Sequence, residues 1–216
     1  MTKRGSRRGP IALLGVVIAA SVLTGCGGPQ MSPQVTPSEE GSFAAAKEQN
    51  LAFKETVAEV QKQIFTGEWR VAEYGDVPER CDEGYEFFLR RNLPEGFSFN
   101  GEGTQRMADL RAWMTENGWQ VAPSPTYGEG IDNIVIMAGK PEANVSRLDV
   151  DFIPGSAAEG TIDVLELRAT STCEPGDAAA LLEQLRGPLQ AVPDETGVPD
   201  LESPDATPLF ERHTEG

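Results

Sequence analysis

The sequence predicts an α+β domain: a mainly antiparallel sheet of four to six strands with helices packed on one face, and one disulfide. Three observations predict this fold class. Segments with helical and strand periodicity follow one another in the order α-β-β-α-β-β-β-β-α. The links between the later strands are short, which favours hairpins over parallel crossovers. The chain has 216 residues, 39% of them hydrophobic, which is enough apolar material for one core.

An amphipathic helix is predicted over residues 42–65. Its apolar residues recur at steps of four, three and four and form one face, which consists of Phe53, Val57, Val60 and Ile64. Gly67 follows this segment and ends the helix. Two strands are predicted next, at residues 69–74 and 85–90, because apolar and polar residues alternate there and prolines follow both segments.

A second helix is predicted over residues 105–117, with Thr104 as its N-cap and Gly118 at the left-handed position after its end. Its apolar face consists of Met107, Leu110 and Met114. A third, short helix begins after Asp177, which is placed to cap it. This helix carries Leu181, Leu182, Leu185 and Leu189.

Four strands lie between the second and third helices, at residues 119–127, 131–138, 147–153 and 161–170. The first contains two prolines, so we expect it at an edge of the sheet. The strand at 147–153 alternates most clearly, with Leu148, Val150 and Phe152 facing the core and Arg147, Asp149 and Asp151 facing solvent.

The hairpin formed by the last two strands has the sharpest local pattern of charge. If Phe152 pairs with Ile162, Asp151 lies opposite Asp163 on the polar face. A bulge in the last strand would add Glu166 to this negative patch. Like charges directly opposite each other are unfavourable unless they are solvated or bridged. We interpret the patch as a solvated outer face; a calcium site is the alternative, although the liganding loop signature is absent.

Residues 1–25 have the organisation of a lipoprotein signal peptide. A basic region is formed by Lys3, Arg4, Arg7 and Arg8. The apolar stretch that follows, residues 11–23, is 13 residues long, shorter than the ~20 that a spanning helix needs. Leu23-Thr24-Gly25-Cys26 then resembles a bacterial lipobox. We therefore expect Cys26 to be the diacylated N-terminus of the mature protein, anchored on the extracytoplasmic face of the cell membrane.

The rest of the chain divides by composition. Residues 26–42 are rich in proline and small polar residues and are expected to form a flexible tether. Residues 43–190 form the single α+β domain. Residues 191–216 are acidic and rich in proline, which predicts a mostly disordered tail. Within this tail, Leu209-Phe210 is an apolar pair. We interpret it as an ordinary part of the tail; a docking role is the alternative.

The charge of the chain excludes two classes of partner. There are 18 Lys and Arg residues against 34 Asp and Glu residues, a net charge of −16. Removal of the signal peptide takes away four cations and no carboxylate, which leaves 14 against 34, or −20. A chain of this sign is repelled by nucleic acid and by anionic membrane surfaces. The lipid, and no polybasic patch, is expected to supply membrane attachment.

The chain contains three cysteines. Lipidation consumes Cys26 and leaves Cys81 and Cys173 as a pair in an oxidising compartment, where a disulfide is expected. Two buried thiols or part of a metal site are the alternatives. A zinc site needs four ligands, and the only histidine, His213, lies at the end of the acidic tail.

Over roughly residues 42–208 the mature chain resembles the LppA-type family of small actinobacterial lipoproteins. The features that carry the resemblance are Cys26, Gly67-Glu68-Trp69, Cys81, Asn117-Gly118, Thr172-Cys173 and a proline-rich tail. The acidity of the tail departs from the family pattern. The resemblance implies a cellular location and a fold more than a chemistry, because the family as known has no established catalytic activity.

No catalytic residues are predicted. Nucleophilic catalysis needs a histidine held in a pocket, and His213 lies in the tail. The sequence also lacks the Gly-x-Ser-x-Gly, His-Glu-x-x-His and Walker patterns. We therefore predict a non-covalent binding or assembly module of the cell envelope, without a metal or organic cofactor. An envelope hydrolase that uses a pair of carboxylates is the alternative, because carboxylates are plentiful.

The ligand-binding residues are not predicted beyond two weak candidates, Trp113 and Trp119. They flank the end of the second helix, where a groove between helix and sheet would lie. Core packing is the preferred interpretation for both, and for Trp69 as well. The expected partners are an envelope protein or a cell-wall ligand, basic or neutral in charge.

Overall fold

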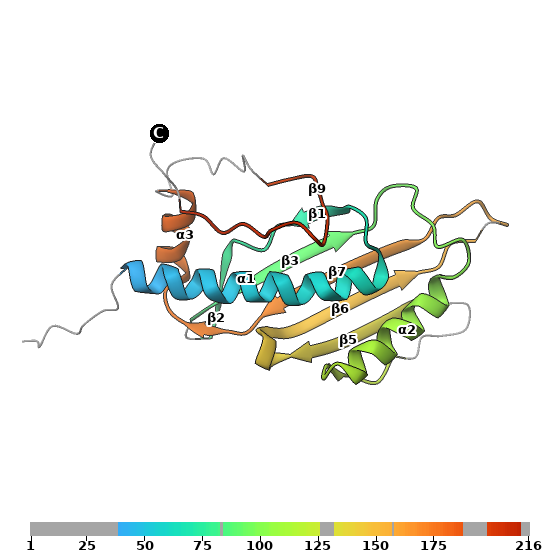
Figure 1. Ribbon diagram of the computed structural model, residues 1–216, viewed down its shortest axis with the longest axis horizontal. Coiled ribbons are helices and arrows are strands. Elements are labelled where there is room, and N and C mark those ends of the chain that lie inside the picture. Colours follow the sequence, from blue (N-terminus) through green and yellow to red (C-terminus); the bar gives the residue numbers. More distant parts are fainter. Residues whose placement is uncertain (1–38, 83, 126–131, 157, 188–197, 213–216) are drawn as a thin grey trace, which may run out of the picture. The chain divides into compact units, whose positions relative to one another are not determined.

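The computed structural model describes residues 39–82, 84–125, 132–156, 158–187 and 198–212, which form the predicted α+β domain (Figure 1). Its helices are α1 (Glu39–Ile64), α2 (Gly103–Glu116) and α3 (Ala178–Arg186), with a 3-10 turn, η1, at Pro141–Ala143. Its strands are β1 (Trp69–Glu73), β2 (Pro78–Cys81), β3 (Gly84–Asn92), β4 (Gln120–Val121), β5 (Ile134–Lys140), β6 (Val145–Ile153), β7 (Val164–Ser171), β8 (Glu174–Pro175) and β9 (Leu201–Glu202).

The sheet of the described residues has nine strands, so the prediction of four to six was wrong. Its strands follow the order β4-β5-β6-β7-β3-β1-β9, and β2 and β8 also pair with β3. The pairs are antiparallel, as predicted. Four of the strands, β2, β4, β8 and β9, are only two to four residues long. Segments this short cannot show a period of two, which is why the sequence did not reveal most of them.

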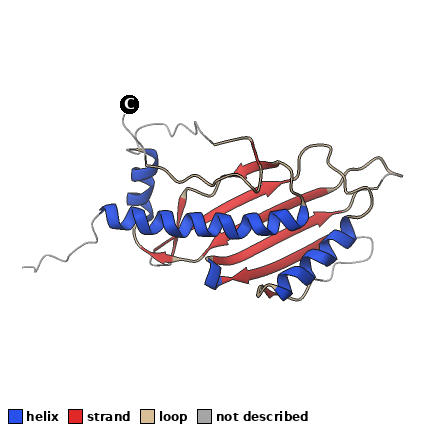
Figure 2. Ribbon diagram, viewed as in Figure 1, coloured by secondary structure: helices blue, strands red, loops and turns tan. Residues whose placement is uncertain are grey.

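Helices α1 and α2 cover the same face of the sheet (Figures 1 and 2). Helix α1 lies across β6 and β7, and α2 lies along β5 at the other side of this face. The predicted apolar stripe of α1 is confirmed, since Phe53, Val57 and Val60 are fully buried and Ile64 is 3% exposed. The stripe meets the alternate residues of the strands that point to the same side, among them Phe87, Leu89, Leu148, Val150, Leu165 and Leu167.

Of the three signals predicted at the ends of the second and third helices, two are confirmed. Asp177 caps α3 by accepting hydrogen bonds from the backbone N–H groups of Ala179 and Ala180. Gly118 takes the left-handed conformation after α2, with φ +82°. Thr104, in contrast, is not the N-cap of α2. The helix begins at Gly103, where a Cβ would collide with the ring of Phe152, so close packing against the sheet fixes its start.

The register of the last hairpin differs from the prediction. Phe152 pairs with Leu165 and Asp151 pairs with Glu166, while Asp163 precedes β7. The irregularity in this pair of strands lies near Val145, at the opposite end from the predicted bulge. The outer face is consequently not a purely negative patch, because Glu166 forms an ion pair of 3.2 Å with the neighbouring Arg168.

Asp163 explains the shift of register. Its buried carboxylate accepts hydrogen bonds from the backbone N–H of Phe99, at 2.5 Å, and from that of Gly155, at 2.8 Å. The side chain therefore holds its own loop and the loop of Phe99 at the end of the sheet. The ladder of β7 begins at Val164, the residue after Asp163. Nothing in the periodicity of the sequence distinguishes this carboxylate from an exposed one.

Replacement of Asp163 by alanine is expected to lower the free energy of unfolding by about 2 kcal/mol, because it leaves the buried N–H of Phe99 and the partly buried N–H of Gly155 without an acceptor. Urea denaturation followed by circular dichroism measures this loss. Glu159→Ala is the matched control, since Glu159 lies in the same loop with an exposed side chain. Equal stabilities of the two variants would show that the Asp163 hydrogen bonds do not hold the loops.

The domain is longer at both ends than the predicted range 43–190. Helix α1 begins at Glu39, inside the segment predicted as a tether. Residues 198–212, which we name the C-terminal strap, were predicted as part of a mostly disordered tail, but they contain β9 and run back along α1 (Figure 1). Pro204 and Phe210 of the strap are buried. The prediction failed for this segment because a few anchoring side chains outweigh its acidic, proline-rich composition.

Candidate functional site

The C-terminal strap occupies a groove between α1 and the β1 edge of the sheet. Its first part adds a strand to that edge, because β9 pairs antiparallel with β1 and Trp69 lies opposite Glu202. The backbone N–H of Val71 also donates to the carbonyl of Asp200, at 2.9 Å. These bonds involve only main-chain groups, so they would form with other sequences as well.

The far end of the strap is anchored by an aromatic side chain. Phe210 is 1% exposed, and its ring centroid lies 5.3 Å from that of Phe43 on α1 and 5.6 Å from that of Phe87 on β3. Arg212 then stacks on the outer side of Phe43, at 4.4 Å from the ring centroid. A pocket lined by helix and sheet therefore holds one aromatic side chain of an extended segment.

Between these two anchors, side chains of the domain bind the main chain of the strap. Lys54 on α1 donates from Nζ to the carbonyl oxygen of Leu209, at 2.9 Å. The backbone N–H of the same Leu209 donates to the hydroxyl oxygen of Tyr74, at 3.1 Å. Nζ of Lys54 also lies 3.7 Å from the centroid of the Tyr74 ring. Both polar groups of one strap residue are thus held, while its side chain is 46% exposed.

Two ion pairs lie near Lys54. Arg91, 3% exposed, donates to Glu202 of β9 at 2.8 Å and to the carbonyl oxygen of Glu73 at 2.6 Å. Asp76 accepts two hydrogen bonds from the guanidinium of Arg186 on α3, at 2.8 and 2.9 Å. Each of these carboxylates already has a guanidinium partner. No ion pair of Lys54 occurs within the described part of the chain.

Burial changes the acidity of several groups in this cluster. The pKa of Lys54 falls from 10.5 to about 7, mainly because burial penalises the ammonium ion, while the charge of Asp76 opposes the shift. Burial also lowers the pKa of the Arg91 guanidinium and raises the pKa of the Tyr74 hydroxyl. A strongly shifted group such as Lys54 beside a cavity is typical of functional sites.

Hollows flank the strap on both sides. A cavity of about 260 Å³ lies between the strap and α1, with Lys54 and Arg91 among its lining residues and Glu59 and Asp205 joined across it by Lys62. A second hollow of about 430 Å³ borders Tyr74, Glu68 and the strap residue Leu201. The strap therefore does not fill its groove, and space remains for larger side chains.

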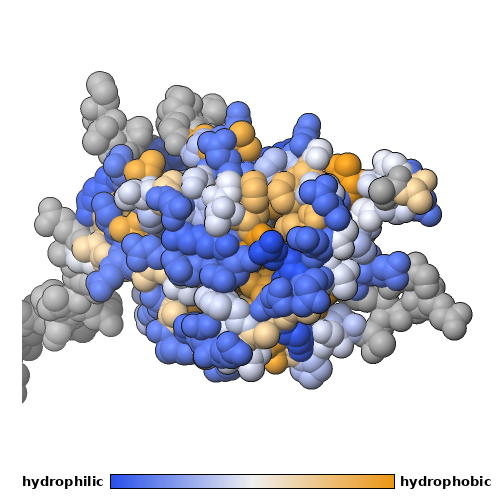
Figure 3. Space-filling view, turned by 45° about the vertical axis from the view of Figure 1, so that its right-hand side comes forward, coloured by the Kyte–Doolittle hydropathy of each residue, from blue (hydrophilic) through white to orange (hydrophobic). Residues whose placement is uncertain are grey.

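The surface drawn in Figure 3 is mostly hydrophilic, with hydrophobic side chains in small patches between charged and polar ones. No broad apolar area is visible on this face. The groove of the strap contains main-chain hydrogen bonds, buried charges and a pocket that holds an aromatic side chain.

The two tryptophans singled out from the sequence lie elsewhere. Trp119 is 5% exposed, with the ammonium of Lys140 at 5.9 Å from its ring centroid, and Trp113 is partly buried against the core. Neither lines the hollows beside the strap. Trp69 is fully buried and donates from its indole nitrogen to the carbonyl oxygen of Phe65, at 2.9 Å. Core packing accounts for these side chains.

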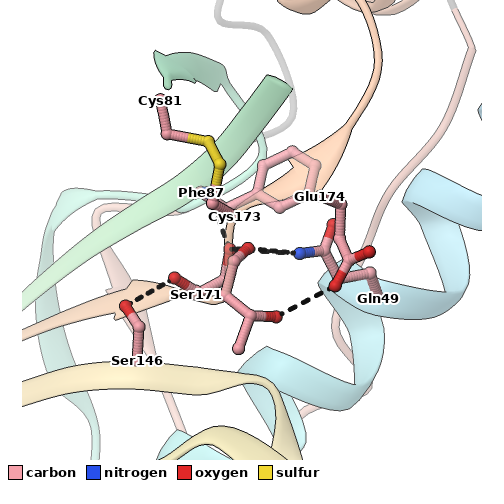
Figure 4. Close-up of a disulfide and its surroundings, with 8 residues drawn as sticks. Gln49, Cys81, Phe87, Ser146, Ser171, Cys173 and Glu174 are labelled. Atoms are coloured by element: carbon pink, nitrogen blue, oxygen red, sulfur yellow. Dashed lines mark hydrogen bonds between the residues drawn. A yellow bond between two sulfur atoms is a disulfide. The ribbon is translucent and has the colours of Figure 1, made fainter. Parts of the chain in front are cut away.

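The predicted disulfide between Cys81 and Cys173 is confirmed (Figure 4). A buried hydrogen-bond network lies beside it and joins α1 to the sheet. Gln49 on α1 donates to the carbonyl oxygen of Thr172 at 2.6 Å, and Ser171 accepts from the backbone N–H of Phe87 at 2.9 Å. This region holds α1 in place, and α1 in turn forms one wall of the strap groove.

Cys26 and His213 lie outside the described residues. Within the described ranges, no group of three or more histidine, cysteine or carboxylate side chains is arranged to hold a metal ion. Among the same residues, no helix has the length and apolarity that crossing a membrane requires.

No family model, curated protein or solved structure matched the chain. Sequence reasoning missed the groove of the strap because its parts come from α1, β1, β3 and the strap, which are distant in the chain. One signal was present: Asn50, Lys54 and Gln61 lie at helical spacing beside the apolar stripe of α1, and all three are buried. Arg91 likewise continues the buried alternation of Phe87 and Leu89.

Proposed function

We propose that the protein is a lipid-anchored protein of the cell envelope that acts as a non-covalent binding or assembly module, and that it binds an extended polypeptide of an envelope partner in the groove of the strap. The lipobox supports the location, and the resemblance to LppA-type lipoproteins agrees with it. The observation that carries the binding role is the double hydrogen bond to Leu209, from Lys54 and to Tyr74. Side chains placed to hold both main-chain groups of a residue recognise an extended chain whatever its sequence.

The groove uses three general elements of peptide recognition. Strand addition at β1 supplies main-chain hydrogen bonds, Lys54 and Tyr74 hold a peptide unit, and the pocket of Phe210 selects an aromatic or large apolar side chain. In the structure the chain's own strap meets all three requirements. A partner segment with an aromatic side chain at the same spacing meets them equally well and replaces the strap.

A labelled synthetic peptide with the sequence of residues 198–212 tests whether the groove accepts a polypeptide in trans. The mature chain carrying Phe210→Ala, whose own strap is weakened, is expected to bind this peptide saturably in fluorescence anisotropy. A peptide with Phe210→Ala should bind at least about tenfold more weakly, because it loses the aromatic anchor, whereas Leu209→Ala should bind like the parent. Equal binding of all three peptides, or none, would contradict a specific groove.

Cross-linking in intact cells tests whether a partner uses the groove. A photoreactive residue at Thr207, which is exposed and borders both hollows, is expected to give an adduct with an envelope component. The same residue at Glu159, exposed in the hairpin between β6 and β7, serves as the control position. Adducts of equal yield at both positions would argue against the groove as the binding site.

The lipid anchor is tested by Cys26→Ala, which is expected to abolish lipidation because the thiol that receives the lipid is absent. Mass spectrometry of the membrane fraction should show an unprocessed precursor without lipid mass. Recovery of a processed, lipid-bearing protein from this variant would refute the assignment of Cys26.

A further inference from the structure

Lys54 joins α1 to the strap with its side chain almost completely enclosed. It is 6% exposed, and its nitrogen lies between the carbonyl oxygen of Leu209 and the face of the Tyr74 ring. The strap itself forms part of this enclosure, because Leu209 belongs to it. Departure of the strap would therefore return the amine to water.

The charged groups that face Lys54 come from every neighbouring element. Asp76, which lies between β1 and β2, pairs with Arg186 of α3. Arg91 of β3 pairs with Glu202 of β9. The two carboxylates attract an ammonium ion and the two guanidinium groups repel it. Since both carboxylates are already engaged, the ammonium form of Lys54 has no counter-ion in contact with it among the described residues.

A primary amine can donate a hydrogen bond to Leu209 in either protonation state, but only the neutral form does so without a buried net charge. The Tyr74 ring and the Leu209 carbonyl attract an ammonium ion, but burial removes its hydration and lowers the pKa of Lys54. The docked strap therefore favours the neutral amine more than water does, and the detached strap favours the ammonium ion. We infer that uptake of a proton by Lys54 releases the strap, so that the groove opens for an extended polypeptide as the pH falls. The opening for a partner rests on the proposed function, whereas the release of the strap does not.

The direction of the pH effect follows from the linkage between proton binding by Lys54 and detachment of the strap. The pKa of Lys54 is about 7 with the strap docked and returns toward 10.5 in water. Between these values the detached state binds one more proton, so each unit of falling pH favours detachment by up to about tenfold, and the effect levels off below pH 7. Tyr74 stays protonated between pH 6 and pH 8.5, because its ordinary pKa of 10.0 is raised further by burial.

Hydrogen exchange of the strap amides tests the release directly. The mature chain with Cys26→Ser is compared at pH 8.5 and pH 6 by rapid mixing, with rates corrected for the intrinsic effect of pH. We expect the protection of the strap to fall by on the order of thirtyfold at pH 6, while amides of β6 and β7 keep theirs. Lys54→Met should make the protection of the strap independent of pH.

Lys47→Met is the matched control, because Lys47 lies on the same helix with an exposed side chain and should leave the pH effect intact. A pH effect that persists in Lys54→Met, or one that is equal in β6 and β7, would overturn the inference. Direct titration of the Lys54 side-chain signals by NMR needs no variant: a midpoint near 10.5 would also refute it. Failure of the strap peptide to bind would refute the proposed function while leaving this release untouched.

Discussion

Phe210→Ala is expected to lower the free energy of unfolding by about 3 to 5 kcal/mol, the usual loss for a large aromatic side chain removed from a packed site. Phe210 is 1% exposed and contacts the rings of Phe43 and Phe87. Alanine leaves a cavity between α1 and β3 and removes the anchor of the strap. The measured loss stops at the free energy with which the strap docks, because a strap that has detached no longer contributes.

Urea denaturation gives the size of the loss, and hydrogen exchange shows where it falls. We expect the amides of residues 198–212 to lose their protection first, and those of β6 and β7 to change less. Leu209→Ala is the matched control: this apolar neighbour is 46% exposed, so its removal should change stability by no more than about 0.5 kcal/mol. If the two variants lose the same small amount, Phe210 is not the anchor of the strap.

Most of the fold could be predicted because long elements impose a period on the sequence. The stripe of Phe53, Val57, Val60 and Ile64 gave α1, and the alternation through Leu148, Val150 and Phe152 gave β6; all seven residues are buried. Short strands gave no such signal. The register of the last hairpin also could not be read, because Asp163 accepts hydrogen bonds from the backbone N–H groups of Gly155 in its own loop and Phe99 in another, and β7 begins only after it.

The candidate site was less accessible to sequence reasoning than the fold. Composition assigns residues 198–212 to a disordered tail, since most of them are acidic, proline or small. Two buried side chains, Pro204 and Phe210, reverse that outcome. A lysine in a helix is normally exposed, and only its position beside Asn50 and Gln61 marked Lys54 as different. Long-range contacts of this kind have no local pattern.

Cys173→Ser is expected to lower the free energy of unfolding by about 2 to 4 kcal/mol and the melting temperature by roughly 5 to 15 °C. The bond closes a sequence separation of 92 residues, which in the chain-entropy model restricts the unfolded state by about 4.5 kcal/mol before any strain in the native state. Calorimetry of the oxidised protein and the variant measures the shift. Cys81→Ser and the reduced wild-type protein should have the same melting temperature as Cys173→Ser. Equal melting temperatures of the oxidised and reduced wild-type protein would refute the stabilising role of the disulfide.

The position of the disulfide predicts which part of the domain loses stability in Cys173→Ser. Cys81 ends β2 and Cys173 precedes β8, and both short strands pair with the start of β3 around Gly84. Neither strand has enough ladder bonds to hold this corner alone, so we expect hydrogen exchange to rise there first in Cys173→Ser.

The network of Gln49, Ser171 and Phe87 does not depend on the sulfur atoms. It should keep α1 on the sheet, so the variant is expected to remain folded at 25 °C with its strap groove intact. Loss of strap protection together with the loss at β2 would show instead that the disulfide also supports the groove.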